Sequence, residues 1–138
     1  MLNHLAHRFW ALLLVVGIAQ APMPYQNRNQ IDYDPLVVRV IAGTVSDSHG
    51  SIPNARIGLF SEPGHQLVTE IRADDNGTFR TDAPSGEYRL VVAVDGLCPA
   101  NAKIRVAAWP RGGLFRSRQL RVRLTVGSID SCSWIEYR

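Results

Sequence analysis

The sequence predicts an all-β fold, a single β-sandwich of seven to eight strands that follows an N-terminal signal peptide. Short apolar runs alternate residue by residue with polar positions, as expected of strands with one buried face. Turn-forming Gly, Pro, Asn and Asp residues separate these runs at regular spacing, which is typical of sandwiches. No run keeps a helical period over about eleven residues or more. The length of 138 residues suits one domain.

The first 21 residues have the pattern of a secretory signal peptide. Arg8 precedes an eleven-residue apolar run from Phe9 to Ala19, which is shorter than the roughly 20 residues of a membrane span. Cleavage after Ala19 is favoured over cleavage after Ala21, because Pro22 would follow the second cut. The alternative is an uncleaved anchor helix. Both interpretations predict an extracytoplasmic domain, secreted or periplasmic.

The rest of the chain divides into a polar, flexible lead-in at residues 22–35 and a sandwich domain at residues 36–138. We expect strands at residues 36–46, 55–60, 66–73, 78–81, 87–94, 102–108, 119–126 and 133–137, the last of them at a sheet edge. Their inner faces follow from strict alternation. The inward residues then include Ile41 and Val45; Ala55, Ile57 and Leu59; Leu67, Thr69 and Ile71; Tyr88, Leu90, Val92 and Val94; and Leu120, Val122, Leu124 and Val126.

The chain has two cysteines, Cys98 and Cys132. An even pair in an exported protein predicts one disulfide. Closing a loop of about 33 residues would stabilise the fold by roughly 3–4 kcal/mol on the chain-entropy model. The alternative is two separate buried thiols.

Three segments carry a family resemblance. They are Ile41-x-Gly43-x-Val45-x-Asp47-x-x-Gly50-x-Ile52-x-x-Ala55-x-Ile57, Asp74-x-x-Gly77-x-Phe79, and Gly86-x-Tyr88-x-Leu90. Together they resemble the carboxypeptidase regulatory-like domain, a transthyretin-like β-sandwich with a carbohydrate-binding-like fold that is related to Cna B-type modules. The resemblance implies a structural or binding module, for carbohydrate or protein, without peptidase activity. A bacterial source is our working assumption.

Catalytic and metal-binding patterns are not evident. A zinc carboxypeptidase needs a His and a Glu at close spacing, yet neither His49 nor His65 has a Glu three residues on. Ser48 and His49 fall in an expected turn, where both residue types are common. We therefore expect no catalytic residue, no metal and no cofactor, and a protein that is not an enzyme.

The segment from Asp74 to Gly77 is faintly similar to a calcium-binding loop. Arg72 and Ala83 stand where the first and last acidic ligands of such a loop would be, so a hairpin turn is the better interpretation. A calcium ion held between adjacent loops by Asp47, Asp74 or Asp82 stays an alternative.

Charge is unevenly distributed along a chain whose net charge is only +3. Residues 22–95 hold ten acidic and six basic side chains, whereas residues 96–138 hold two acidic and eight basic ones. The basic excess favours an anionic partner. The alternative is that the two parts lie near each other in the fold, so that their charges partly cancel.

Arginine and tryptophan supply the candidate ligand-binding residues. Arg121 and Arg123 alternate with apolar residues and should share the outer face of one strand. Tryptophan rings are natural platforms for sugars. The candidates are Trp109, Arg111, Arg121, Arg123 and Trp134. The alternatives are a solvated outer face for the arginines and, for the tryptophans, plugs at the ends of the sandwich.

The sequence thus predicts an exported, non-catalytic binding or structural module. Carbohydrate is the first ligand class to consider, and the alternative is a protein-interaction module of a cell-envelope complex. The expected partner is a polysaccharide or an envelope protein. We expect no nucleic-acid partner, because a net charge of +3 is modest, and no membrane span in the mature chain.

Overall fold

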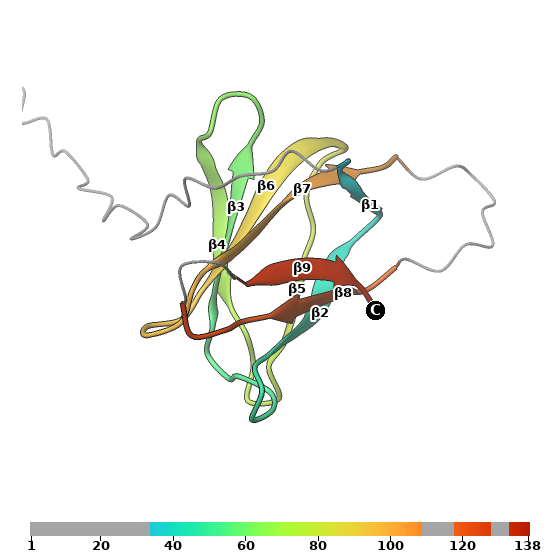
Figure 1. Cartoon of the computed structure of the whole chain (residues 1–138). Helices are drawn as coiled ribbons and strands as arrows, with labels where there is room; N and C mark the ends of the chain where they lie inside the picture. Colours follow the sequence, from blue (N-terminus) through green and yellow to red (C-terminus); the bar gives the residue numbers. More distant parts are fainter. Residues whose placement is uncertain (1–33, 109–117, 128–132) are drawn as a thin grey trace, which may run out of the picture.

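A computed structural model describes residues 34–108, 118–127 and 133–138, and all statements on structure concern these residues. They form nine strands in two sheets, which confirms the predicted all-β sandwich (Figure 1). The strands are β1 (Leu36–Val38), β2 (Ile41–Ser46), β3 (Arg56–Ser61), β4 (Leu67–Arg72), β5 (Thr78–Thr81), β6 (Gly86–Ala93), β7 (Ala100–Val106), β8 (Leu120–Arg123) and β9 (Trp134–Tyr137). In this part of the chain there is no helix that could cross a membrane.

The two sheets share one hydrophobic core. The first has five strands in the order β1-β7-β6-β3-β4, and the second has four in the order β5-β2-β8-β9. Inward side chains of both sheets are fully buried, and the largest are Ile41, Ile57, Leu59, Leu90, Ile104, Leu120 and Leu124. Each apolar side chain of this size contributes roughly 1.5–3 kcal/mol through burial, so the core is the main source of stability.

The strand predicted over residues 36–46 is in fact two strands. β1 pairs in parallel with β7 of the five-stranded sheet, whereas β2 lies between β5 and β8 of the four-stranded sheet. The reason is visible in Val38 and Ile41, which are both buried although they are three residues apart. A continuous strand would place them on opposite faces, so the chain must bend between them.

Two predicted inward residues are exposed. Leu67 is 39% exposed because the register between β3 and β4 shifts by one residue after the Leu59–Thr69 pair, which turns Leu67 to the outer side. Val126 is 75% exposed because β8 ends at Arg123. Beyond that point the chain leaves the sheet, and Thr125 bridges to Cys98 instead.

Two glycines of the family pattern are required by geometry. A Cβ atom at Gly43 would lie 2.2 Å from the carbonyl oxygen of Leu120, so only glycine lets β2 approach β8 this closely. Gly77 has φ of 72°, and a Cβ there would lie 2.7 Å from the carbonyl oxygen of Val45. The same turn is held by Asp74, whose Oδ1 accepts hydrogen bonds from the N–H groups of Asn76 and Thr78 at 2.9 and 2.8 Å.

The predicted C-terminal edge strand is present as β9, and it connects the two sheets. The Tyr137 hydroxyl oxygen accepts a hydrogen bond from the N–H of Val37 at 2.6 Å, and Val37 belongs to β1 of the opposite sheet. Arg118 lies over the Tyr137 ring, 4.8 Å from its centroid. β9 therefore closes the sandwich beside β1 (Figure 1).

Candidate functional site

On the outer face of the five-stranded sheet, Arg56, Arg89 and Arg105 are paired with acidic side chains, whereas Arg72 donates to Asn54. Arg56 forms two hydrogen bonds with Glu70, both 3.1 Å long, and the Glu70 carboxylate raises the pKa of Arg56. The Arg105 guanidinium lies 2.7 Å from the carboxylate of Glu87. Exposed pairs of this kind contribute little to stability, but they engage the donors that a ligand would otherwise use.

One pair on this sheet is largely shielded from water. Arg89 and Glu62 approach to 2.7 Å, and their side chains are only 15% and 14% exposed. The amide oxygen of Asn101 also accepts a hydrogen bond from Arg89 at 3.3 Å. A charge-assisted contact with so little exposure holds the β6–β7 surface and the loop after β3 together.

The outer face of the four-stranded sheet has a different composition, and we call it the arginine face. Its long side chains are those of Arg80 on β5, Arg121 and Arg123 on β8, Trp134 and Glu136 on β9, and Arg138 directly after β9. All six alternate with buried or core-packed residues, so they point away from the core. Trp134 is 46% exposed.

Strand register arranges the arginine face as three rows across the sheet. Arg123 lies between Ser46 and Trp134, and Arg121 lies between Thr44 and Glu136. Arg80 pairs with Ala42 in the third row, where the N–H of Arg138 donates to the carbonyl of Gln119. β2 therefore contributes only the short side chains of Ala42, Thr44 and Ser46, and arginines flank them on both sides.

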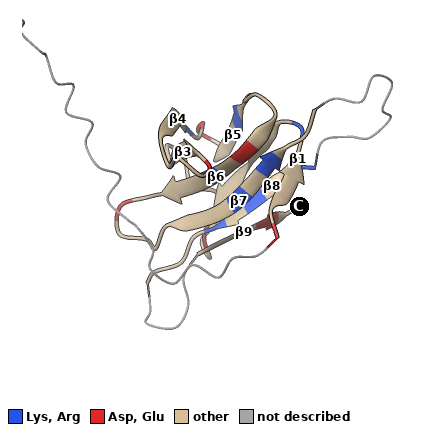
Figure 2. Cartoon of the chain, turned by 90° about the horizontal axis from the view of Figure 1, so that it is seen from above, with Lys and Arg blue, Asp and Glu red and all other residues tan. Residues whose placement is uncertain are grey.

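Acidic partners are scarce on the arginine face. The nearest approach is that of Arg121 to Glu136, whose atoms Nη1 and Oε1 are 3.9 Å apart. Arg80, Arg123 and Arg138 form no ion pair with the residues that the structure describes. Arg123 instead donates to the backbone carbonyl of Asp47 at 3.4 Å. Figure 2 shows the basic positions of the described strands in blue and the acidic positions in red.

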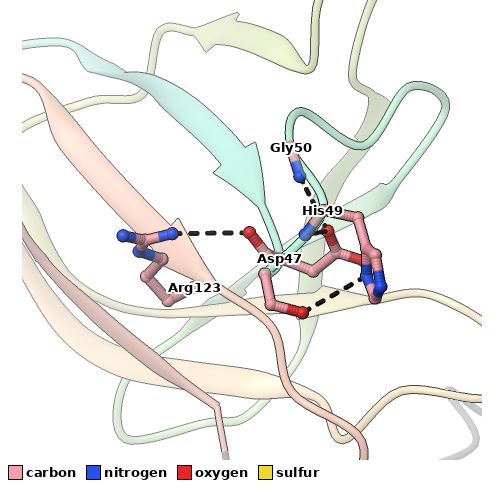
Figure 3. Close-up of polar contacts among 5 residues, drawn as sticks. Asp47, His49, Gly50 and Arg123 are labelled. Carbon is pink, nitrogen blue, oxygen red and sulfur yellow. Dashed lines mark hydrogen bonds and ion pairs between the residues drawn. The ribbon is translucent and has the colours of Figure 1, made fainter.

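A turn beside the arginine face contains Ser, His and Asp side chains (Figure 3). Asp47 Oδ1 accepts hydrogen bonds from the N–H groups of His49 and Gly50, at 2.7 and 3.0 Å. These bonds hold the pKa of Asp47 below its ordinary value, and the bond from the His49 N–H has the largest effect. The turn following β2 is thus organised by its own aspartate, as expected from the sequence.

The same turn does not have the geometry of a catalytic triad. Ser48 Oγ and Asp47 Oδ2 both approach Nδ1 of His49, at 3.2 and 3.7 Å. A triad needs the acid on one ring nitrogen and the nucleophile on the other. The His49 side chain is moreover 90% exposed, and water would compete for its hydrogen bonds.

The chain matches a protein-family model. The model of the carboxypeptidase regulatory-like domain matches residues 40–125, which span β2 to β8. The chain belongs to the carboxypeptidase regulatory-like domain family. No curated protein sequence matches the chain significantly.

Among solved structures, the domain is similar to a 3-chlorocatechol 1,2-dioxygenase from Rhodococcus opacus 1CP. The TM-score is 0.39 at 11% identity, and the match covers 91% of this chain and 67% of the dioxygenase chain.

The regulatory-like domain brings together three of the residues predicted as ligand-binding. Arg121, Arg123 and Trp134 are neighbours on the arginine face, and Arg123 is directly opposite Trp134. Trp109 and Arg111 lie outside the described residues. Arg80 and Arg138 were not predicted to belong with them. Alternation about the buried Phe79 is a signal that Arg80 points outward, but only the β5–β2 pairing places it on this face.

The predicted disulfide stays a prediction, because Cys132 lies outside the described residues. Cys98 lies just before β7, and its carbonyl oxygen accepts a hydrogen bond from the hydroxyl of Ser133. That hydroxyl also accepts from the N–H of Thr125 at 2.9 Å. The residue that follows Cys132 is therefore in contact with Cys98.

A metal site of this regulatory-like domain would need several ligating side chains in one place. Within residues 34–108, 118–127 and 133–138, no three His, Cys, Asp or Glu side chains gather closely enough to hold a metal ion. Asp47 and Asp74 instead accept hydrogen bonds from the backbone of their own turns.

Proposed function

We propose that this protein is an exported, non-catalytic binding module that recognises carbohydrate through the arginine face. The observation that carries the proposal is an exposed Trp134 directly opposite Arg123, an arginine without an acidic partner among the described residues. The carboxypeptidase regulatory-like domain is a β-sandwich module that is often non-catalytic.

The hydrogen-bond donors of this face support a binding role. A guanidinium group has five N–H donors in a fixed plane and suits hydroxyl, carboxylate and phosphate oxygens. On the five-stranded sheet, carboxylates at 2.7–3.1 Å occupy donors of Arg56, Arg89 and Arg105. On the arginine face, the carboxylate of Glu136 is farther away, 3.9 Å from Arg121, and Arg123 donates to the backbone carbonyl of Asp47, so a ligand there competes less with protein carboxylates.

The tryptophan supports carbohydrate as the ligand class. A sugar ring has an apolar face and a polar rim, and an exposed indole offers a flat apolar surface for the former. Trp134 lies on β9, whose hydrogen bonds to β8 fix its position relative to Arg123. The ring and the guanidinium can therefore contact one sugar unit together.

The binding role is tested by co-sedimentation of the purified protein with insoluble cell-wall polysaccharide. We expect Trp134→Ala to lose most of the bound fraction. The matched control is Val37→Ala, which removes an exposed apolar side chain from the opposite sheet. Equal loss in both variants, or no sedimentation of the wild type, would contradict the proposal.

Export is supported by the leader pattern in residues 1–21. Full-length protein produced in a bacterial host should be recovered from the periplasm or medium, beginning at residue 20 or 22. Recovery of the intact chain from the cytoplasm would contradict the export part of the proposal.

A second candidate is a protein-interaction module of a cell-envelope complex. It is supported by β4, an edge strand of the described sheet that pairs only with β3 and exposes Leu67 and Val68. Capture of one envelope protein by the wild type but not by Val68→Lys would favour this function over the first.

A further inference from the structure

We propose that the ligand of the arginine face is an anionic polysaccharide, which lies as an extended chain along β2 between the arginines of β5 and β8. This inference rests on the proposed function and specifies its ligand.

The register places the arginines at successive levels of β2. Arg80 is level with Ala42, Arg121 with Thr44, and Arg123 with Ser46. Residues of one strand that face the same side are roughly 7 Å apart. The Cα atoms of the three arginines therefore span about 13 Å along the direction of β2. β5 and β8 are two strand spacings apart, or roughly 10 Å. These are dimensions of an extended polymer of several units rather than of one small anion.

Short side chains on β2 allow a polymer to approach the sheet. Ala42, Thr44 and Ser46 are partly buried, and none has a long side chain that would stand between Arg80 on β5 and the two arginines of β8. The hydroxyls of Thr44 and Ser46 add donors and acceptors suited to sugar hydroxyls. β2 therefore forms a low strip with a basic border on each side.

Charge favours an anionic chain over a neutral one. Among the six long side chains of the arginine face, four are positive and one is negative, so these side chains have a net charge of +3. The single carboxylate, on Glu136, is 3.9 Å from Arg121, so it only weakly compensates that guanidinium. The positive charges of these arginines are not cancelled by carboxylates of the described residues. A chain with several anionic groups would therefore be attracted by each arginine that it contacts.

Trp134 distinguishes a polysaccharide from the other anionic surfaces. Its ring is the only large apolar side chain described as exposed on this face, and it stands beside Arg123. A membrane-binding face needs several apolar side chains that can enter the lipid. A protein partner needs an apolar centre, whereas the centre here is Ala42, Thr44 and Ser46. A polymer that alternates rings with anionic groups uses both the indole and the guanidinium.

The test is affinity electrophoresis of the purified protein in gels that contain polygalacturonate, dextran sulfate or neutral dextran, at low and at high NaCl. The variant is Arg80→Gln/Arg123→Gln. The matched control is Arg72→Gln/Arg105→Gln, which removes the same charge from exposed positions of the five-stranded sheet. Thermal unfolding shows that each variant is folded.

We expect retardation by polygalacturonate or dextran sulfate that weakens with salt, and little retardation by neutral dextran. Arg80→Gln/Arg123→Gln should weaken the apparent affinity roughly threefold to thirtyfold, as the loss of two exposed charge contacts implies. The control should stay within about twofold of the wild type.

Three outcomes would overturn the inference, and they separate it from the proposed function. Salt-insensitive binding to neutral dextran, lost in Trp134→Ala, would leave a carbohydrate-binding module whose ligand is not anionic. Equal weakening in the variant and the control would show attraction by net charge alone. Binding to none of the polysaccharides, with binding to phosphatidylglycerol vesicles instead, would remove both the inference and the carbohydrate function.

Discussion

The arginines on the outer faces of the two sheets differ in their acidic partners. On the five-stranded sheet, Arg56, Arg89 and Arg105 each meet a glutamate within 3.1 Å. On the four-stranded sheet, Arg121 is 3.9 Å from Glu136, and the other arginines have no ion pair among the described residues. The number of arginines on a surface therefore says little about binding, whereas the positions of the acidic residues decide which arginines a ligand can reach.

The strongest test of how these two sheets are joined concerns the predicted disulfide. Cys98 lies before β7 of one sheet and Cys132 before β9 of the other. If they are bonded, Cys98→Ser should lower the free energy of unfolding by roughly 3–4 kcal/mol, measured by chemical denaturation. The wild type in reducing agent should behave like the variant. Two reactive thiols in the unfolded, unreduced wild type would exclude the bond.

The arginine pairs of the two faces should differ in their effect on stability. Arg89→Ala removes a contact with Glu62 that is about 85% shielded from water, so the free energy of unfolding should fall by about 1.5–3 kcal/mol. Arg121→Ala should change it by less than about 0.5 kcal/mol, because that pair is long and exposed. Denaturant titration of both variants measures the difference, and equal losses would show that the faces do not differ as described.

A smaller effect is expected where β9 contacts β1. Tyr137→Phe removes the hydrogen bonds of the hydroxyl to Val37 but keeps the aromatic ring in place. The free energy of unfolding should fall by about 0.5–1.5 kcal/mol. Hydrogen exchange should show faster opening of β9 than of β8 in this variant. If the amides of β1 and β9 keep their protection, the contact does not join the sheets.

The smallest effect concerns the turn beside the arginine face. The folded-state pKa of Asp47 lies below the ordinary value of 3.8, so its charged form favours folding. That contribution is present at neutral pH and is lost as the pH falls through the folded-state pKa. Asp47→Asn should therefore melt slightly below the wild type at pH 7, and the two should converge in acid. A difference that is constant from pH 7 to the acid limit would contradict this sign.

The alternation of apolar and polar residues within a single strand such as β6 was sufficient to predict which side chains are buried. Tyr88, Leu90 and Val92 were predicted to be inward on β6, and all three are buried. Alternation failed where the chain changes sheet between Val38 and Ile41, and where the β3–β4 register shifts at Leu67. The first follows from pairing with the distant strands β7 and β8, and the second from an irregularity within the β3–β4 pair, and local alternation reports neither.

The candidate site shows the same limit. The alternation of β8 placed Arg121 and Arg123 on one face in advance. Arg80 is some forty residues away along the chain, and only the order β5-β2-β8-β9 brings it to that face. The acidic partners of the other arginines are also set by strand pairing, so the sequence could not reveal which arginines have donors left for a ligand.

In the function that we propose, the arginine face binds the ligand and the outer face of the five-stranded sheet does not. The most direct test is NMR titration of ¹⁵N-labelled protein with short polygalacturonate chains. We expect the amide shifts to be concentrated on β2, β5, β8 and β9, and the indole N–H of Trp134 to shift with them. Shifts concentrated on β3, β4, β6 and β7, or spread evenly over both sheets, would contradict it.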